Sequence, residues 1–121
     1  MATLNKRIAE DIQATGSFSF TVPDTQRMNN FVVEMIMSGI TYPAAENDAS
    51  LSIQDGEIDP DSGDSTNFQT VDGGFVLVAA GETRVKIRIV DLATKNVKIV
   101  YAPNSVSAGT IESITITFQS S

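Results

Sequence analysis

The chain contains no cysteine, no histidine and no tryptophan among its 121 residues. Without cysteine it can form no disulfide, zinc–thiolate site or cysteine nucleophile. Without histidine it lacks the commonest general base and the commonest transition-metal ligand. Serine and threonine are plentiful, but no histidine, and no lysine in a recognisable motif, is placed to activate them. We therefore expect no enzyme activity and no cofactor.

Long hydrophobic runs are also absent. The longest apolar run, residues 75–80, is far shorter than the roughly 20 residues that a transmembrane helix needs. The N-terminal "MATLNKRIAEDIQ" has Lys6 and Arg7 but no apolar stretch behind them, so it does not resemble a secretory signal. We expect the chain to be made and first folded in a cytoplasm, and to have no membrane partner.

The formal charge of −7 argues against a nucleic-acid partner, because a phosphate backbone attracts lysine and arginine. The charge is unevenly distributed. Residues 1–83 carry thirteen acids against three bases, whereas residues 84–98 carry five bases against one acid. The last third of the chain therefore contributes a basic stripe to an acidic molecule.

Period-two alternation dominates the sequence. In "TRVKIRIV" the apolar Val85, Ile87 and Ile89 alternate with basic residues, which is typical of a strand with one buried face. Similar runs are "SFSFTV", "NFVVEMIMSG", "ASLSIQD", "GFVLVAAG", "NVKIVYAP" and "TIESITITF", and Gly, Pro, Asn and Asp separate them. The pattern predicts an all-β, antiparallel β-sandwich or jelly roll of seven or eight strands, with residues 17–121 as a single domain and a tight turn at "VDGG".

The N-terminal residues 1–16 fit two patterns. Leu4, Ile8 and Ile12 are spaced four apart, as on a helix face, and Gly16 could end such a helix. Ile8 and Ile12 also fit a period of two, with Glu10 on their face. We favour an extended arm or first strand.

The stretch "DGEIDPDSGDSTNF" holds five carboxylates in ten positions, Asp55, Glu57, Asp59, Asp61 and Asp64. Calcium prefers such oxygen ligands. An EF-hand reading that starts at Glu57 fails, because the required glycine is replaced by Ser62 and the required glutamate by Phe68. Catalytic carboxyl pairs need rigid, partly desolvated positions, which a polar loop does not provide. We favour a solvated loop, with no metal ligands assigned.

The basic stripe of Arg84, Lys86 and Arg88 has two interpretations. It can be the solvent face of one strand, where lysine also discourages sheet-to-sheet aggregation. Alternatively it meets Asp59, Asp61 and Asp64 of a neighbouring subunit in a head-to-tail contact, which closes into a ring when the rotation permits. These six residues are the candidate subunit interface.

The eight aromatic residues mostly lie on the apolar phase of strands, and we expect them in the core. A carbohydrate-binding sandwich for host-surface attachment remains an alternative, with a site built from "SGITYPAAEND" and the acidic stretch. The absence of tryptophan weakens it, because sugar binders usually present exposed aromatic platforms.

Taken from Leu51 to Gln119, the chain resembles small virion proteins of tailed bacteriophages. The resemblance lies in a strand running into an Asp-Gly-rich loop with Asn67 and Phe68, then hairpin strands, the strand and turn in "VKIVYAPN", and a final strand opened by "GTI". It implies a β-sandwich that works by assembly: a head-decoration (cement) protein, or a small tail or head-fibre component.

Such proteins are often homotrimers on the capsid surface. The resemblance therefore implies a virion location, the major capsid protein or other virion subunits as partners, and a homo-oligomer, with a trimer favoured. It carries no functional residues over to this chain. We expect residues 1–16 to reach across a subunit boundary.

Overall fold

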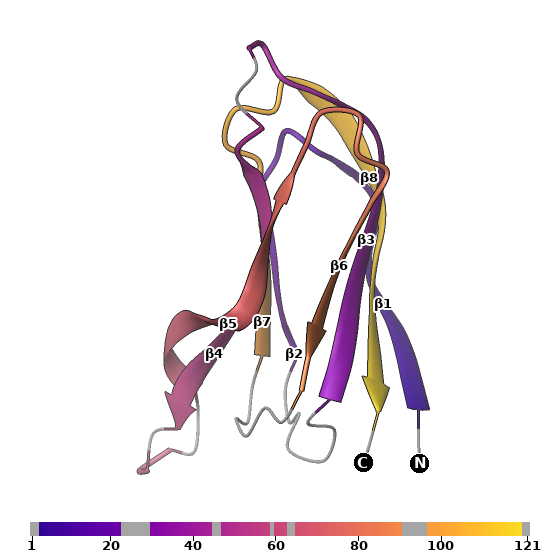
Figure 1. The fold of residues 1–121 in the computed structure, drawn as a ribbon. Coiled ribbons are helices and arrows are strands. Elements are labelled where there is room, and N and C mark those ends of the chain that lie inside the picture. The colour runs from indigo at the N-terminus through magenta and orange to yellow at the C-terminus, as the bar shows by residue number, and fades with distance from the viewer. Residues whose placement is uncertain are drawn as a thin grey trace.

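The computed structural model describes residues 3–22, 30–44, 47–58, 60–62, 65–90 and 97–119. Its strands are β1 (Thr3–Gln13), β2 (Phe18–Val22), β3 (Asn30–Thr41), β4 (Ala49–Ile58), β5 (Ser65–Val78), β6 (Arg84–Ile89), β7 (Val97–Ala102) and β8 (Ala108–Gln119). They form two four-stranded antiparallel sheets packed face to face (Figure 1). The predicted all-β antiparallel sandwich is confirmed.

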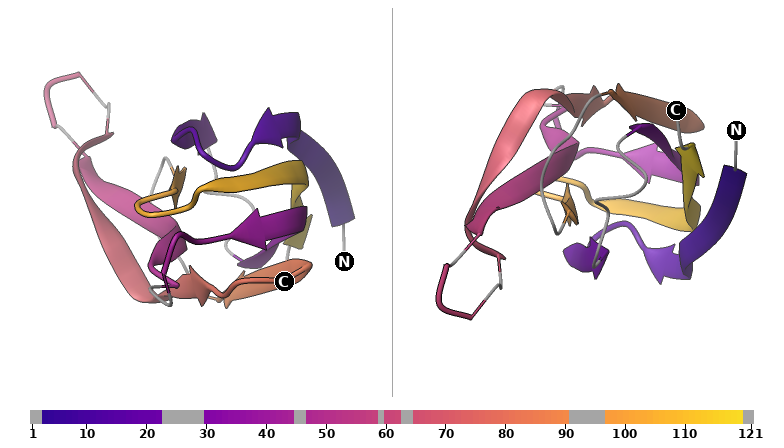
Figure 2. Two further views of the ribbon diagram at one scale, coloured as in Figure 1. Left: turned by 90° about the horizontal axis from the view of Figure 1, so that it is seen from above. Right: turned by 90° about the horizontal axis from the view of Figure 1, so that it is seen from below.

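The strand order gives the sandwich jelly-roll connectivity. Sheet A has the order β1-β8-β3-β6 and sheet B the order β2-β7-β4-β5. Strands therefore pair first with last and inward from there, β1 with β8, β2 with β7, β3 with β6 and β4 with β5. This nesting is that of one long hairpin rolled over itself, the arrangement of eight-stranded jelly rolls. Only the β4–β5 connection joins neighbours within one sheet, and that hairpin projects from the body (Figure 2).

The core lies between the sheets because the apolar residues of each strand occupy one phase of the pleat. On β6 the burial alternates strictly, with Val85, Ile87 and Ile89 at 5%, 3% and 5% exposed. The facing positions on the central strands are also closed to solvent. They include Val33, Met35, Leu51, Ile53, Ile99, Tyr101, Ile114 and Ile116. Burying a side chain of this size contributes about 1.5–3 kcal/mol, so this layer is the main source of stability.

Residues 3–13 form a strand, so the helical alternative for the N-terminus is wrong. β1 pairs with β8 of its own chain as the edge of sheet A. A register shift between Arg7 and Ala9, and a positive φ of 52° at Asp11, keep Glu10 exposed while Ile8 and Ile12 pack against the core. Because of this irregularity, Glu10 does not share the inward face of β1 with Ile8 and Ile12. The division at residue 16 and a reach across a subunit boundary stay predictions.

The tight turn predicted at "VDGG" is wrong, because residues 71–74 lie inside β5. Thr70 pairs with Gln54 and Phe75 with Ser52, so four residues bulge out opposite Ile53 alone. Gly73 takes the positive φ of 74° that the sequence suggested. Position 74 has room only for glycine, because a Cβ there would lie 2.6 Å from a Val71 methyl and 2.9 Å from the Ile53 carbonyl oxygen. The described turn residues between β4 and β5 are 60–62.

The described part of the chain includes no helix that is long and apolar enough to cross a membrane.

Candidate functional site

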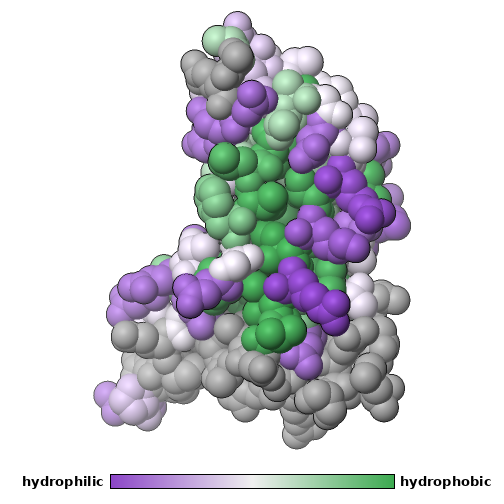
Figure 3. All heavy atoms as spheres, in the orientation of Figure 1, coloured by the Kyte–Doolittle hydropathy of each residue, from purple (hydrophilic) through white to green (hydrophobic). Residues whose placement is uncertain are grey.

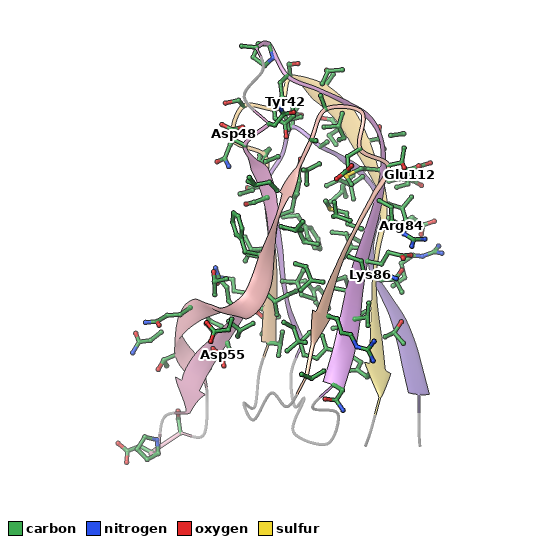
Figure 4. The ribbon with its side chains drawn as sticks, viewed as in Figure 1. Tyr42, Asp48, Asp55, Arg84, Lys86 and Glu112 are labelled. Atoms are coloured by element: carbon green, nitrogen blue, oxygen red, sulfur yellow. The ribbon has the colours of Figure 1, made fainter. Side chains whose placement is uncertain are left out.

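Three surface features of the sandwich are candidates for function: the basic strip on β6, the acidic β4–β5 hairpin and an apolar patch on β5. A fourth polar cluster, at the end of the sandwich that carries Tyr42 and Asp48, has its hydrogen-bonding groups engaged within the chain (Figure 4). The basic strip and the apolar patch follow from strand alternation, whereas the polar cluster lies in loops.

The basic strip, Arg84, Lys86 and Arg88, lies on the outer face of sheet A. All three are exposed, because their neighbours on β6 take the inward phase. β3 supplies their cross-strand neighbours: Ile36 beside Arg84, Glu34 beside Lys86 and Val32 beside Arg88. Arg84 Nε lies 3.4 Å from Glu34 Oε2, with both side chains partly solvated, so this ion pair contributes little to stability. The strip keeps a net positive charge.

The acidic hairpin, residues 55–69, begins where β4 and β5 leave the sandwich. Asp55 is half-buried, Asp61 is exposed in the turn, and Asp59 and Asp64 lie outside the described residues. An open depression of about 180 Å³ at the hairpin's base is lined by Asp55, Gly56, Asn67 and Gln69. Within the residues that the structure describes, no group of three acids is placed to hold a metal ion.

The structure places Asp55, at the base of the acidic hairpin, away from the basic strip of the same chain. Figure 4 shows Asp55 on one side of the sandwich, with Arg84 and Lys86 pointing away from the opposite side. Contact between these groups therefore requires another molecule.

The apolar patch, Phe75 and Leu77, was not anticipated, and the expectation that Phe75 lies in the core is wrong. The two side chains are 55% and 53% exposed on the outer face of β5, an edge strand of sheet B. Their cross-strand neighbours on β4 are Ser52 and Ser50, each 8% exposed. Figure 3 shows apolar side chains gathered along the side where β5 and β6 lie. Two neighbouring exposed apolar side chains on an edge strand make this patch a candidate interaction surface.

The outer face of sheet B continues from the patch toward the hairpin. There Lys98 Nζ lies 5.7 Å from the centroid of the Phe68 ring, a cation–π contact. Phe68 is half-buried. The outer face of sheet B thus presents the apolar patch at one end and the cation–π contact of Lys98 with Phe68 at the other.

The polar cluster ties three loops together. The Asp48 carboxylate accepts hydrogen bonds from Ser105 N, at 3.0 Å, and from Ser105 Oγ, at 2.8 Å. Asn104 Nδ2 donates to the Asp48 carbonyl at 2.6 Å. The Tyr42 hydroxyl donates to the Val78 carbonyl and accepts from Ala49 N. These groups serve the fold, so Tyr42 and Asp48 of the segment considered for a glycan site are engaged within the chain, and residues 38–41 of that segment belong to β3.

Ionisation in the cluster follows these contacts. The hydrogen bonds from Ser105 lower the pKa of Asp48, because they favour its charged form. Burial raises the pKa of Tyr42, since removing the phenol from water disfavours the phenolate.

Replacing Asp48 with alanine should lower the melting temperature modestly at neutral pH. A carboxyl whose pKa is depressed by folding stabilises the protein above its unfolded pKa, and that contribution is lost as the pH falls through the folded value. The difference between wild type and variant should therefore shrink as the pH is lowered below about 4. Thermal melts followed by circular dichroism at several pH values measure it, and a difference that stays constant with pH would contradict the role of the carboxylate.

No protein-family model matches the chain, and no curated protein matches it significantly. Solved structures that are similar include the SPBc2 prophage-derived protein YomS, at 14% identity over 97% of this chain and 92% of that one, with a TM-score of 0.49. The K1 cleaved adhesin domain of Lys-gingipain from Porphyromonas gingivalis W83 has 9% identity over 100% and 99% of the two chains, with a TM-score of 0.48.

A third similar structure is the Clostridium thermocellum xylanase 10B, with its CBM22-1 and GH10 modules, at 10% identity. It covers 97% of this chain and 26% of that one, with a TM-score of 0.48. Likenesses at such identities, with TM-scores of 0.49 or less, carry no inference about what this chain binds.

Proposed function

We propose that the chain is a structural virion protein of a bacteriophage, a capsid decoration (cement) protein that binds the assembled capsid surface and stabilises it. The observation that carries the proposal is the apolar patch, where Phe75 and Leu77 are each more than half exposed on the outer face of an edge strand. The resemblance of residues 51–119 to small virion proteins is the reason for proposing a capsid protein as the partner of this surface. A small tail or head-fibre component would use the same patch on another virion protein.

The proposed mechanism is passive and involves no catalytic turnover. A subunit that binds only where capsid proteins are correctly assembled favours the assembled state by mass action. The patch supplies apolar area for such a contact. Ser50 and Ser52 beside it are small and nearly covered, so a partner can approach the sheet without displacing long polar side chains.

A second candidate function is carbohydrate binding by the same outer face of sheet B. The observation that favours it is that Phe68 and Phe75 both lie on β5 and are not fully buried. A glycan array run with the wild-type protein and with Phe75→Ser tests it. Silence on the array removes this candidate and leaves the capsid proposal.

Replacing both Phe75 and Leu77 with serine should weaken capsid binding roughly 30-fold. The contact loses the burial of two apolar side chains against the capsid, which is worth about 2 kcal/mol. Capsids lacking the subunit, from the phage that encodes it, are mixed with purified protein and sedimented. The wild-type protein should co-sediment and raise the temperature at which the capsids disrupt. The double variant should do neither at the same concentration.

The matched control is Val90→Ser, because Val90 is 59% exposed but lies beyond the end of β6 rather than on the patch. It should bind as wild type does. Unchanged binding by the double variant would show that the patch is not the capsid contact, and a wild-type protein that ignores capsids would overturn the proposed function. Far-UV circular dichroism establishes that each variant is folded.

A further inference from the structure

The two charged surfaces of this chain are complementary and lie on opposite sides of it (Figure 4). The basic strip faces outward from sheet A, and the acidic hairpin projects from the side of sheet B (Figure 2). The sandwich separates the two surfaces, so the side chains of one cannot contact those of the other within the same molecule. The arrangement suits a contact between molecules in which the two partners use different surfaces.

The outer face of β3 and β6 has the composition of a docking surface. Ile36, 36% exposed, and the half-buried Val32 alternate along β3 with Glu34. Each of these apolar residues has an arginine as its cross-strand neighbour on β6, Arg84 for Ile36 and Arg88 for Val32. Apolar and charged side chains therefore alternate across this face, and both kinds contribute to protein–protein interfaces.

The cations of this face are incompletely neutralised. Glu34 pairs with Arg84 and is also the cross-strand neighbour of Lys86. Among the residues that the structure describes, no carboxylate is recorded in an ion pair with Lys86 or Arg88. Within β3 and β6, one carboxylate lies beside three cations, so this pair of strands keeps a positive charge that can attract an acidic partner.

The hairpin has the matching chemistry. Its sequence places five carboxylates and no base between residues 55 and 64. The depression at its base combines the Asp55 carboxylate with the side-chain amides of Asn67 and Gln69 in a space of about 180 Å³. Carboxylate and amide oxygens are hydrogen-bond acceptors for a guanidinium, which presents its donors in a planar fork. The hairpin of one copy can thus receive an arginine of another.

We propose that the basic strip and the adjacent face of β3 bind the acidic hairpin of a second copy of this chain, so that copies associate head to tail. A contact of this kind uses two different surfaces and generates a closed ring or a filament. A ring of three agrees with the trimer that the resemblance to virion proteins implies. The inference goes beyond the capsid role, because it concerns the protein alone in solution.

The test is the mass of the purified protein, measured by sedimentation velocity across a range of concentrations. Arg88→Glu and Asp61→Lys each reverse one charge of the contact and should each weaken association at least tenfold. An equimolar mixture of the two variants should recover part of it. A contact between unlike variants joins either two wild-type surfaces or two reversed charges that attract, whereas a ring of three keeps one contact between like variants. A misfolded variant would not be rescued by mixing.

Arg7→Glu and Asp72→Lys are the matched controls. Arg7 is an exposed cation on β1, at the other edge of sheet A, and Asp72 is an exposed acid on β5 outside the hairpin. They make the same changes of charge and should leave the mass unchanged. Raising the salt from 0.1 to 1 M, which shortens the Debye length from about 10 to about 3 Å, should dissociate the wild-type oligomer.

A wild-type protein that stays monomeric at low salt would overturn the inference, as would reversals that leave the mass unchanged or that mixing fails to rescue. These outcomes are distinguishable from failure of the proposed function. A monomer that binds capsids through Phe75 and Leu77 would contradict only the proposed self-association. An oligomer that does not bind capsids would contradict only the proposed capsid role.

Discussion

Replacing Tyr101 with alanine should destabilise the protein by about 4–5 kcal/mol, the upper range for removing a buried aromatic ring. Tyr101 is the largest fully buried side chain of the described residues, at 0% exposed, and lies in the centre of the sandwich on β7. Its neighbours across the sheet are Phe18 on β2 and Leu51 on β4. Removing the ring leaves a cavity that strands fixed by hydrogen bonds on both sides cannot close.

The hydroxyl of Tyr101 adds a second term. It donates a hydrogen bond of 2.7 Å to the carbonyl of Ala14, which is 0% exposed and lies just after β1. Tyr101→Phe keeps the ring but leaves this carbonyl without that donor, which should cost about 1–2 kcal/mol. The difference between the two variants separates packing from hydrogen bonding. Thermal and urea unfolding measure both, and the alanine variant should melt more than 10 °C below wild type.

The pH dependence of the same residue gives an independent check. Burial raises the pKa of Tyr101 to about 12, from the ordinary phenol value of 10.0. In the unfolded chain the phenol ionises near pH 10, whereas the folded protein keeps it neutral, so the contribution is complete below pH 10 and is lost as the pH rises toward 12. The stability difference between wild type and Tyr101→Phe should shrink over that interval. A difference that grows with pH would contradict the assignment.

The sequence predicted the strands whose alternation is strict. The run at residues 83–90 became β6 at Arg84–Ile89, and the run at residues 110–118 lies within β8. The outward direction of Arg84, Lys86 and Arg88 followed from the same alternation. Because a strand with one polar face has only one register that buries its apolar side chains, these elements were readable without knowledge of their partners.

The exposure of Phe75 could not be predicted in this way. Residues 75–78 are all apolar, so alternation does not distinguish the buried Val78 from the exposed Phe75. What decides the matter is that β5 is an edge strand whose outer face has no second layer, a property of the whole topology. The bulge at residues 71–74 escaped prediction for a related reason. Asp72-Gly73 favours a turn locally, but pairing with β4 on both sides of it holds the chain in one strand.

The link from Tyr101 to Ala14 spans 87 positions in the chain and has no sequence signature. Ala14 is also held from β8, since its N–H donates a 3.0 Å hydrogen bond to the carbonyl of Gly109. The point where the chain leaves β1 in sheet A for β2 in sheet B is therefore fixed by one residue from each sheet. The conformation of Gly109 is critical to this anchor.

Replacing Gly109 with alanine should destabilise the protein by about 2–4 kcal/mol, from backbone strain and overpacking together. Gly109 has a φ of 138°, which residues with a Cβ rarely adopt. It lies in the bulge where Ser38 pairs with Thr110 and Thr41 with Ala108. A Cβ there would lie 2.7 Å from Ile40 Cδ1 and 3.1 Å from Ile40 Cα, and the second contact is with backbone that cannot rotate away.

Gly81→Ala is the control that isolates the strain. Gly81 also has a positive φ, of 78°, but a Cβ there meets nothing within 4 Å, so its substitution should cost only about 1 kcal/mol. Urea unfolding of the two variants gives the comparison. Equal losses would mean that close approach of the β3 and β8 backbones contributes nothing. A larger loss for Gly109→Ala, accompanied by faster hydrogen exchange of the Ala14 amide, would show that the glycine holds the crossover from sheet A to sheet B, because that amide bonds to the Gly109 carbonyl.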